Sequence, residues 1–187
     1  ADPGFRHHVQ ETFWPGHWMR YCTAEEDVPE LRLYWVRLAF IASGYVHQIG
    51  QETARVLPPN LAMPLTQAAT LLDRPPILSY DAYALYNWRR IDPSGPIAPD
   101  NLATLQNFMC VPDAHGVNQE EWFIVIHVAI EALGARILDT LALYAEGSAE
   151  LDDVLHQMAE TIREMRDVLA RIPEHMDPGI YYKTFRL

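Results

Sequence analysis

Residues that could do chemistry gather in two places in this sequence. His127 lies inside a run of apolar residues, and Glu131 follows it by four positions. Residues four apart share one face of an α-helix, so the imidazole and the carboxylate can meet or point into one cavity. Burying either group without a partner costs free energy. The pair therefore indicates either a satisfied polar contact that fixes helix packing, or a cavity in which His127 hydrogen-bonds a ligand.

The second place is the end of the chain, where Tyr181 and Tyr182 precede Arg186. Two aromatic rings followed by a guanidinium group suit a ligand that has a flat ring and a carboxylate. A further aromatic stretch contains Tyr80 and Tyr83. Taken alone, that stretch predicts core packing, because aromatic side chains dominate buried cores.

Other kinds of chemistry lack their sequence motifs. There is no glycine-rich phosphate loop, no Gly-x-Ser-x-Gly turn and no His-Glu-x-x-His zinc motif. Two cysteines, Cys22 and Cys110, are too few for a disulfide scaffold or a thiolate zinc site. We interpret Cys110 as a buried or loop thiol and not as a nucleophile. We assign no role to His7, His8 and His17.

Composition and charge narrow the class of protein further. The chain has 187 residues, with 14 basic and 25 acidic side chains and a formal net charge of −11. This acidic balance disfavours nucleic acid and anionic membrane surfaces as partners, because both attract clustered Lys and Arg. No apolar run reaches the roughly 20 residues of a membrane-spanning helix. We expect a cytoplasmic protein.

Proline placement indicates where the helices lie. Twelve of the 14 prolines lie at or before Pro112, and residues 30–50 and 113–172 contain none. Since proline breaks helix interiors, long helices are predicted in those two stretches. Residues 120–144 are apolar on nearly all sides and predict a buried helix, whereas residues 151–169 carry one apolar stripe. The predicted fold class is all-α.

Shorter elements and boundaries are predicted as follows. Residues 56–76 read as a loop with a short helix, and Asp100 or Asn101 can cap another short helix that carries Leu102, Leu105 and Phe108. Residues 1–28 form an N-terminal segment. We expect its first residues to have been added for expression of the protein. Residues 29–187 are expected to form the helical portion of one domain.

Five phrases in order resemble the indoleamine 2,3-dioxygenase family of haem enzymes. They are VLPPNLAMPL (56–65), PPILSY (75–80), LYNW with the following DP (85–88 and 92–93), WFIVIHVAIE (122–131) and DPGIYYKTFR (177–186). The resemblance extends over residues 31–187. It implies a helical haem-dioxygenase fold and haem b (iron protoporphyrin IX) as the cofactor.

The resemblance also implies roles for individual residues. Tyr80 and Tyr83 fall where the family lines the pocket for the substrate indole, and Phe123 matches an aromatic residue that packs on that ring. Tyr181 and Tyr182 match a Phe-Phe pair next to the substrate. Residues expected to contact both haem and substrate are Tyr80, Phe123 and His127. Arg186 matches the arginine that binds the substrate carboxylate.

His127 is a departure from the family pattern, because it falls where a family member has a distal serine. The related tryptophan 2,3-dioxygenases have a distal histidine that hydrogen-bonds the indole N–H. We therefore predict His127 as the catalytic residue that accepts this hydrogen bond.

A second departure concerns the proximal haem ligand. The family's proximal histidine lies in a C-terminal part that this sequence does not contain, so we expect a longer polypeptide or a companion chain to supply it. We assign His47, His156 and His175 surface or packing roles.

The predicted function is insertion of O2 across the indole C2–C3 bond of L-tryptophan or a related indole. The product would be of the N-formylkynurenine type, as in the kynurenine pathway of tryptophan catabolism. Two alternatives stay open: a haem-dependent hydroxylase of another aromatic substrate, and a non-catalytic half that needs a partner chain.

Overall fold

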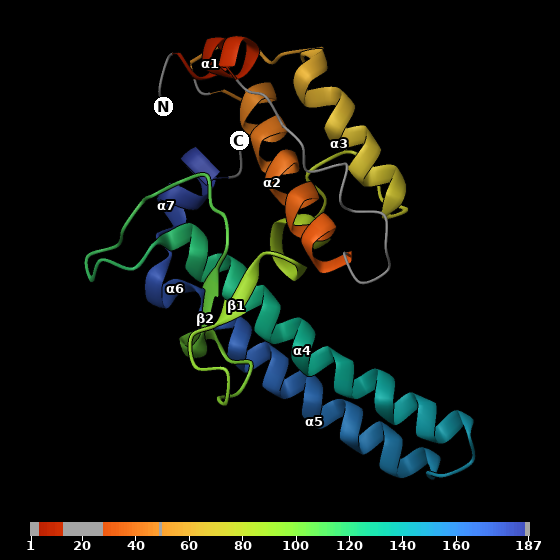
Figure 1. Ribbon diagram of the computed structural model, residues 1–187. Helices are drawn as coiled ribbons and strands as arrows, with labels where there is room; N and C mark the ends of the chain where they lie inside the picture. Colours follow the sequence, from red (N-terminus) through yellow and green to blue (C-terminus); the bar gives the residue numbers. More distant parts are fainter. Residues whose placement is uncertain (1–3, 13–27, 49, 186–187) are drawn as a thin grey trace. The chain divides into compact units, whose positions relative to one another are not determined.

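The computed structural model describes residues 4–12, 28–48 and 50–185. The chain forms two compact units, Ala1–Asn87 and Trp88–Leu187, and each is described by itself (Figure 1). Helices dominate both units, and the described residues contain two strands of three residues each. The all-α prediction is confirmed.

The core of the first unit is built on helix α2 (Val28–Val46), which packs against α3 (Pro59–Leu71). Pro29 and Glu30 stand in the first turn of α2, where a fixed φ and a negative charge both favour a helix start. The apolar residues of α2 recur every three or four positions and pack on apolar residues of α3. The buried members include Leu31, Trp35, Leu38, Ala42 and Tyr45 on α2 and Leu61, Leu65 and Ala68 on α3.

Two further elements complete the first unit. Helix α1 (Phe5–Thr12) packs on α2, and Arg6 donates hydrogen bonds to the carbonyl oxygens of Tyr45 (2.7 Å) and Val46 (3.1 Å). The π-helical turn η3 (Asp81–Leu85) also packs on α2. Helix α3 has 13 residues and fills more of the 56–76 stretch than expected. Pro64 lies in its second turn and removes only one backbone hydrogen bond.

The second unit begins with a small antiparallel sheet. Strand β1 (Trp88–Arg90) pairs with β2 (Leu102–Thr104), and the 3-10 turn η4 (Pro99–Asn101) precedes β2. The prediction of a short helix at Leu102, Leu105 and Phe108 is therefore wrong. Asn101 does not cap a helix, because its side-chain amide donates to the carbonyl oxygens of Asp92 (3.0 Å) and Pro96 (2.8 Å) and closes the loop between the strands.

Helices α4 (Gln119–Ala145) and α5 (Leu151–Leu169) form a hairpin in the second unit (Figure 1). Asn118 caps α4 by accepting a hydrogen bond from the Glu120 backbone N–H at 3.1 Å. The first half of α4 is buried as predicted, but Leu138 is 69% exposed. The later turns of α4 lie along α5, which covers one side of them.

The predicted apolar stripe of α5 is buried only in part. Val154 is buried, whereas Leu155 and Ile162 are each 54% exposed. None of the helices in the described ranges has the length and apolar character needed to cross a bilayer.

The chain then returns to the start of α4 through three short helical elements. These are α6 (Ile172–His175), α7 (Pro178–Ile180) and the π-helical turn η5 (Tyr181–Phe185). Asp177 begins α7, since its Oδ1 accepts a hydrogen bond from the Ile180 N–H at 3.0 Å. Helix α6 packs on α4. The fold thus brings the predicted C-terminal tyrosines beside the helix that carries His127.

Candidate functional site

His127 lies on α4 one turn after Phe123, and the two rings are 4.3 Å apart between centroids. The Nδ1 atom of His127 is 2.7 Å from the Phe123 carbonyl oxygen. A carbonyl oxygen can only accept, so Nδ1 carries the proton in this bond. In the neutral imidazole the other nitrogen, Nε2, is then a hydrogen-bond acceptor. The backbone of α4 thereby fixes the tautomer that an N–H donor on a ligand requires.

Two tyrosines extend this arrangement into an aromatic cluster, by which we mean Phe123, His127, Tyr181 and Tyr182. The Tyr181 ring centroid is 5.6 Å from that of Phe123. Tyr182 meets Tyr181 edge to face at 5.2 Å and is 61% exposed. Helix α4 supplies two members and η5 the other two. The structure therefore brings together four of the seven predicted site residues.

The other three predicted residues are Tyr80, Tyr83 and Arg186. Tyr80 and Tyr83 belong to the first unit, where Tyr80 is 47% exposed and Tyr83 stacks on Phe40 at 5.9 Å. Arg186 lies outside the described residues, as do His17 and Cys22. The roles of Tyr80, Tyr83 and Arg186 stay predictions.

Helix α4 does not bury His127 and Glu131 as a pair. Glu131 is exposed, and His127 is half-buried. The physical reason is position along the helix. Burial on all sides ends near Ile130, and the face of α4 that carries Glu131 opens to solvent there. Among the described residues, no group of three or more His, Cys, Asp or Glu side chains is placed to hold a metal ion.

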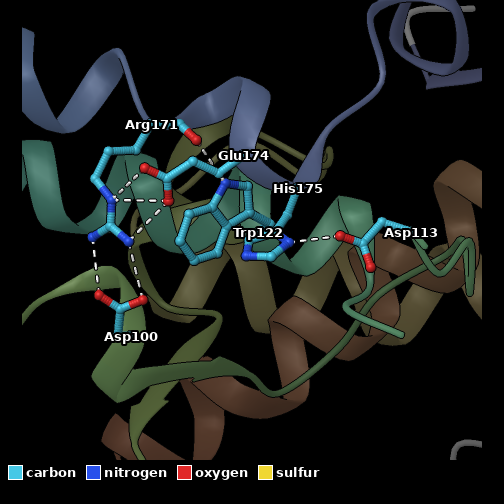
Figure 2. Close-up of polar contacts among 6 residues, drawn as sticks. All are labelled: Asp100, Asp113, Trp122, Arg171, Glu174 and His175. Carbon is cyan, nitrogen blue, oxygen red and sulfur yellow. Dashed lines mark hydrogen bonds and ion pairs between the residues drawn. The ribbon is translucent and has the colours of Figure 1, made fainter. Parts of the chain in front are cut away.

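An ion-pair network holds the returning segment against α4 (Figure 2). The Arg171 guanidinium makes two hydrogen bonds to Asp100, at 3.0 and 3.1 Å, and also binds Glu174. It lies over the Trp122 ring, 5.1 Å from the centroid, and the Trp122 Nε1–H donates to the Arg171 carbonyl oxygen at 3.1 Å. Hydrogen bonding from Arg171 lowers the pKa of Asp100, and these two carboxylates raise the pKa of Arg171.

His175 completes the network on the same indole ring. It meets Trp122 edge to face at 4.7 Å, and its Nδ1 is 2.6 Å from Asp113 Oδ2 (Figure 2). The other oxygen of Asp113 accepts hydrogen bonds from the backbone N–H groups of His115 (2.7 Å) and Val117 (2.9 Å). The hydrogen bond from His175, helped by these two, lowers the pKa of Asp113 from 3.8 to about 2.

Acid is expected to remove the contribution of Asp113 to stability between about pH 4 and pH 2. In that range the unfolded chain binds more protons than the folded chain at this carboxyl, so the stabilisation is complete above the unfolded pKa and is lost as pH falls through the folded pKa. We expect the difference in urea midpoint between the natural chain and Asp113→Asn to shrink as the pH falls from roughly 5 toward 2. A difference that does not change with pH would contradict this assignment.

Sequence reasoning missed this network and one further contact. Asp100 and Arg171 are 71 residues apart, and no local spacing connects them. Gln119 accepts a hydrogen bond from the Asp177 N–H, which is 58 residues away. The Asp177-Pro178 pair did contain a signal, because an Asp before a proline is typical of a helix start.

Surface or packing roles agree with the positions of His47, His156 and His175. His47 is exposed, and His156 is exposed and 3.3 Å from Glu160. His175 is held between Trp122 and Asp113. Cys110 is exposed.

Comparison with known proteins identifies the family. The family model for indoleamine 2,3-dioxygenase matches residues 8–187. Indoleamine 2,3-dioxygenase 2 of Homo sapiens is 30% identical over 164 residues, which are 84% of this chain and 39% of the relative. The indoleamine 2,3-dioxygenase of Saccharomyces cerevisiae is 29% identical over 172 residues, 86% of this chain and 36% of the relative.

Indoleamine 2,3-dioxygenase 1 of Mus musculus is 26% identical over 162 residues, covering 83% of this chain and 38% of the relative. The chain thus spans about two fifths of the length of these relatives. The matched region includes every member of the aromatic cluster and the whole of the Trp122 network. This chain belongs to the indoleamine 2,3-dioxygenase family.

Proposed function

We propose that this chain forms the oxygen-facing side of a haem pocket in a dioxygenase that acts on L-tryptophan or a related indole. The reaction inserts O2 across the indole C2–C3 bond and gives an N-formylkynurenine-type product. One observation carries the proposal. In this chain of the family, His127 lies in the aromatic cluster and its Nδ1 donates to the Phe123 carbonyl oxygen. The Nε2 atom of His127 can then accept a hydrogen bond from an indole N–H.

The donor set of the described residues fits the oxygen-facing side of haem b. His127, Phe123 and Tyr181 offer aromatic surface and a neutral acceptor, which suit a flat apolar group and an indole beside it. Three described histidines are not expected to hold the haem iron. His175 is bonded to Asp113, and His47 and His156 are exposed. The residue that would hold the haem iron would then come from a further part of the polypeptide or from a companion chain.

Ferrous haem supplies the binding and activation of O2 when it is bound. The residues of this chain bind and orient the substrate. Phe123 and Tyr181 form a wall that holds the indole ring in one plane and excludes water from it. The Nε2 atom of His127 accepts the indole N–H and fixes the ring's rotation in that plane. It acts as a hydrogen-bond partner and not as an obligatory base.

Three residues complete the proposed substrate site on the strength of the family resemblance. Tyr80 and Tyr83 add to the aromatic wall. Arg186 binds the substrate carboxylate through a charge-assisted hydrogen bond, whose loss costs about 1.5–3 kcal/mol.

The test is the fate of oxygen in the product. The haem-loaded protein, which includes the further polypeptide or companion chain that would hold the haem iron, is supplied under reducing conditions with L-tryptophan and isotopically labelled O2. We expect a product that contains both labelled oxygen atoms and has the absorbance of N-formylkynurenine. A product with one labelled oxygen would show a hydroxylase instead. Bound haem and bound tryptophan without any product would show a non-catalytic half.

A control tests separately whether this chain alone can hold haem. The 187-residue chain mixed with haem in the absence of other polypeptides is expected to show a weak Soret band, because His175 is bonded to Asp113 and His47 and His156 are exposed. A strong, stable Soret band from this chain alone would show that one of its own residues holds the haem iron.

A further inference from the structure

Gln119, the first residue of α4, has a buried side chain that the proposed reaction does not use. It is 4% exposed, and its Oε1 accepts a hydrogen bond from the Asp177 backbone N–H at 2.9 Å. Its own backbone N–H donates to the Val111 carbonyl oxygen at 3.0 Å. A buried amide with a directed bond to a distant backbone group fixes the relative position of two segments.

Asp177, which Gln119 holds, sets the start of the turn that carries the tyrosines. Its side chain accepts from the Ile180 N–H at 3.0 Å, and its carbonyl oxygen accepts from the Tyr181 N–H at 3.0 Å. The position of Asp177 therefore determines where α7 begins. It also determines where the first residue of η5 lies.

The Gln119–Asp177 hydrogen bond and the Phe123–Tyr181 ring contact join the same two segments in the same alignment. Gln119 and Phe123 are four apart on α4, and Asp177 and Tyr181 are four apart on the returning segment. The hydrogen-bonded pair is separated by 58 residues, and so is the pair of rings. Packing between rings tolerates small slides, whereas a hydrogen bond at 2.9 Å does not. Of the Gln119–Asp177 hydrogen bond and the Phe123–Tyr181 ring contact, the hydrogen bond is therefore the one that fixes the alignment.

We propose that Gln119 is a positioning residue for the substrate site. Its amide oxygen holds residues 177–182 at one position along α4, and this keeps Tyr181 against Phe123 beside His127. The substrate then meets a wall that is already in place, which improves binding more than it changes the reacting atoms. This proposal rests on the proposed function for its consequence in binding, but the fixing of the segment is measurable without it.

The test compares two substitutions that differ in one property. Gln119→Met keeps the length of the side chain and removes the acceptor, and Gln119→Glu keeps an acceptor oxygen at the same place. Val154→Ala serves as the matched control, because it removes buried packing on α5 and leaves the Gln119–Asp177 bond intact. Hydrogen exchange of the Ile180 and Tyr181 amides reports the fixing of the segment directly.

In Gln119→Met we expect these two amides to exchange roughly tenfold faster, the size of effect that one lost neutral hydrogen bond can produce. We expect Gln119→Glu and Val154→Ala to stay near the natural rate. In the haem-loaded protein, Gln119→Met should raise the KM for L-tryptophan by roughly tenfold with kcat changed less than about twofold, and Gln119→Glu should restore KM.

Three outcomes would overturn the proposal. They are natural exchange rates in Gln119→Met, an unchanged KM in that variant, and a Gln119→Glu variant that behaves like Gln119→Met. If the natural protein converts no tryptophan, the proposed function fails, and the exchange rates still decide whether Gln119 fixes the segment.

Discussion

Replacing Trp122 with alanine is expected to lower the free energy of unfolding of the second unit by about 3–5 kcal/mol, as for other buried Trp residues. Trp122 is 5% exposed. Its N–H bonds to the Arg171 carbonyl, Arg171 lies over its ring, and His175 meets its edge (Figure 2). Removal of the ring opens a cavity and also removes three attachments of the returning segment to α4.

Urea denaturation followed by circular dichroism measures this loss. Trp122→Phe is the matched control, since it keeps an aromatic ring and removes the N–H. It should cost about 1–2 kcal/mol, mostly for the lost hydrogen bond to Arg171. Exchange of the Ile172, Glu174 and His175 amides should rise in the alanine variant. A cost below about 1 kcal/mol for Trp122→Ala would show that the ring and its three contacts contribute little to stability.

The second large effect is expected for Glu120→Ala, at about 3 kcal/mol of unfolding free energy, which is typical of hydrogen bonds to a charged acceptor. Glu120 is 2% exposed, and its Oε2 accepts from the backbone N–H groups of Phe108 (2.7 Å) and Met109 (2.6 Å). Alanine leaves both donors without this acceptor. It also removes a negative charge from the first turn of α4, where such a charge is favourable.

Glu120→Gln separates the acceptor from the charge. Its amide oxygen can still accept both hydrogen bonds, so its cost should be about 1 kcal/mol, near that of the lost charge. The measurement is the denaturant midpoint of each variant, with hydrogen exchange at Phe108 and Met109 as a local readout. Equal costs for the two variants would show that the backbone contacts contribute little and that the charge matters most.

The long helices could be predicted from the sequence because their signals are local. A proline-free stretch with nearly continuous apolar residues placed α4 at 120–144, and it spans Gln119–Ala145. The cap at Asn118 and the glutamates after it are part of the same local signal. Similar reasoning located α2 and α5.

Strands β1 and β2 could not be predicted in this way. Three residues are too few for an alternation of apolar and polar side chains to be recognised. Asn101 was expected to cap a helix, but its amide closes the loop at Asp92 and Pro96. Whether such an asparagine caps a helix or closes a loop depends on where the chain turns next. Local spacing does not show where that turn lies.

The candidate site divides in the same way. The nearness of Phe123 and His127 follows from helical spacing, and the resemblance to the family pointed to both. The contact of Tyr181 with Phe123 and the bond between Gln119 and Asp177 depend on the return of the chain past α4. Contacts made between segments 58 residues apart have no counterpart in a local pattern.

The proposed function depends above all on Nε2 of His127 accepting the N–H of a bound indole. This contact is tested most directly by the dissociation constants of L-tryptophan and its N1-methyl analogue, measured in the haem-loaded natural protein and in His127→Ala. The methyl analogue lacks the N–H donor. We expect the natural protein to bind it roughly tenfold more weakly than L-tryptophan, and His127→Ala to retain haem and to bind the two about equally. An unchanged preference for L-tryptophan in His127→Ala, or loss of haem from that variant, would contradict the role assigned to His127.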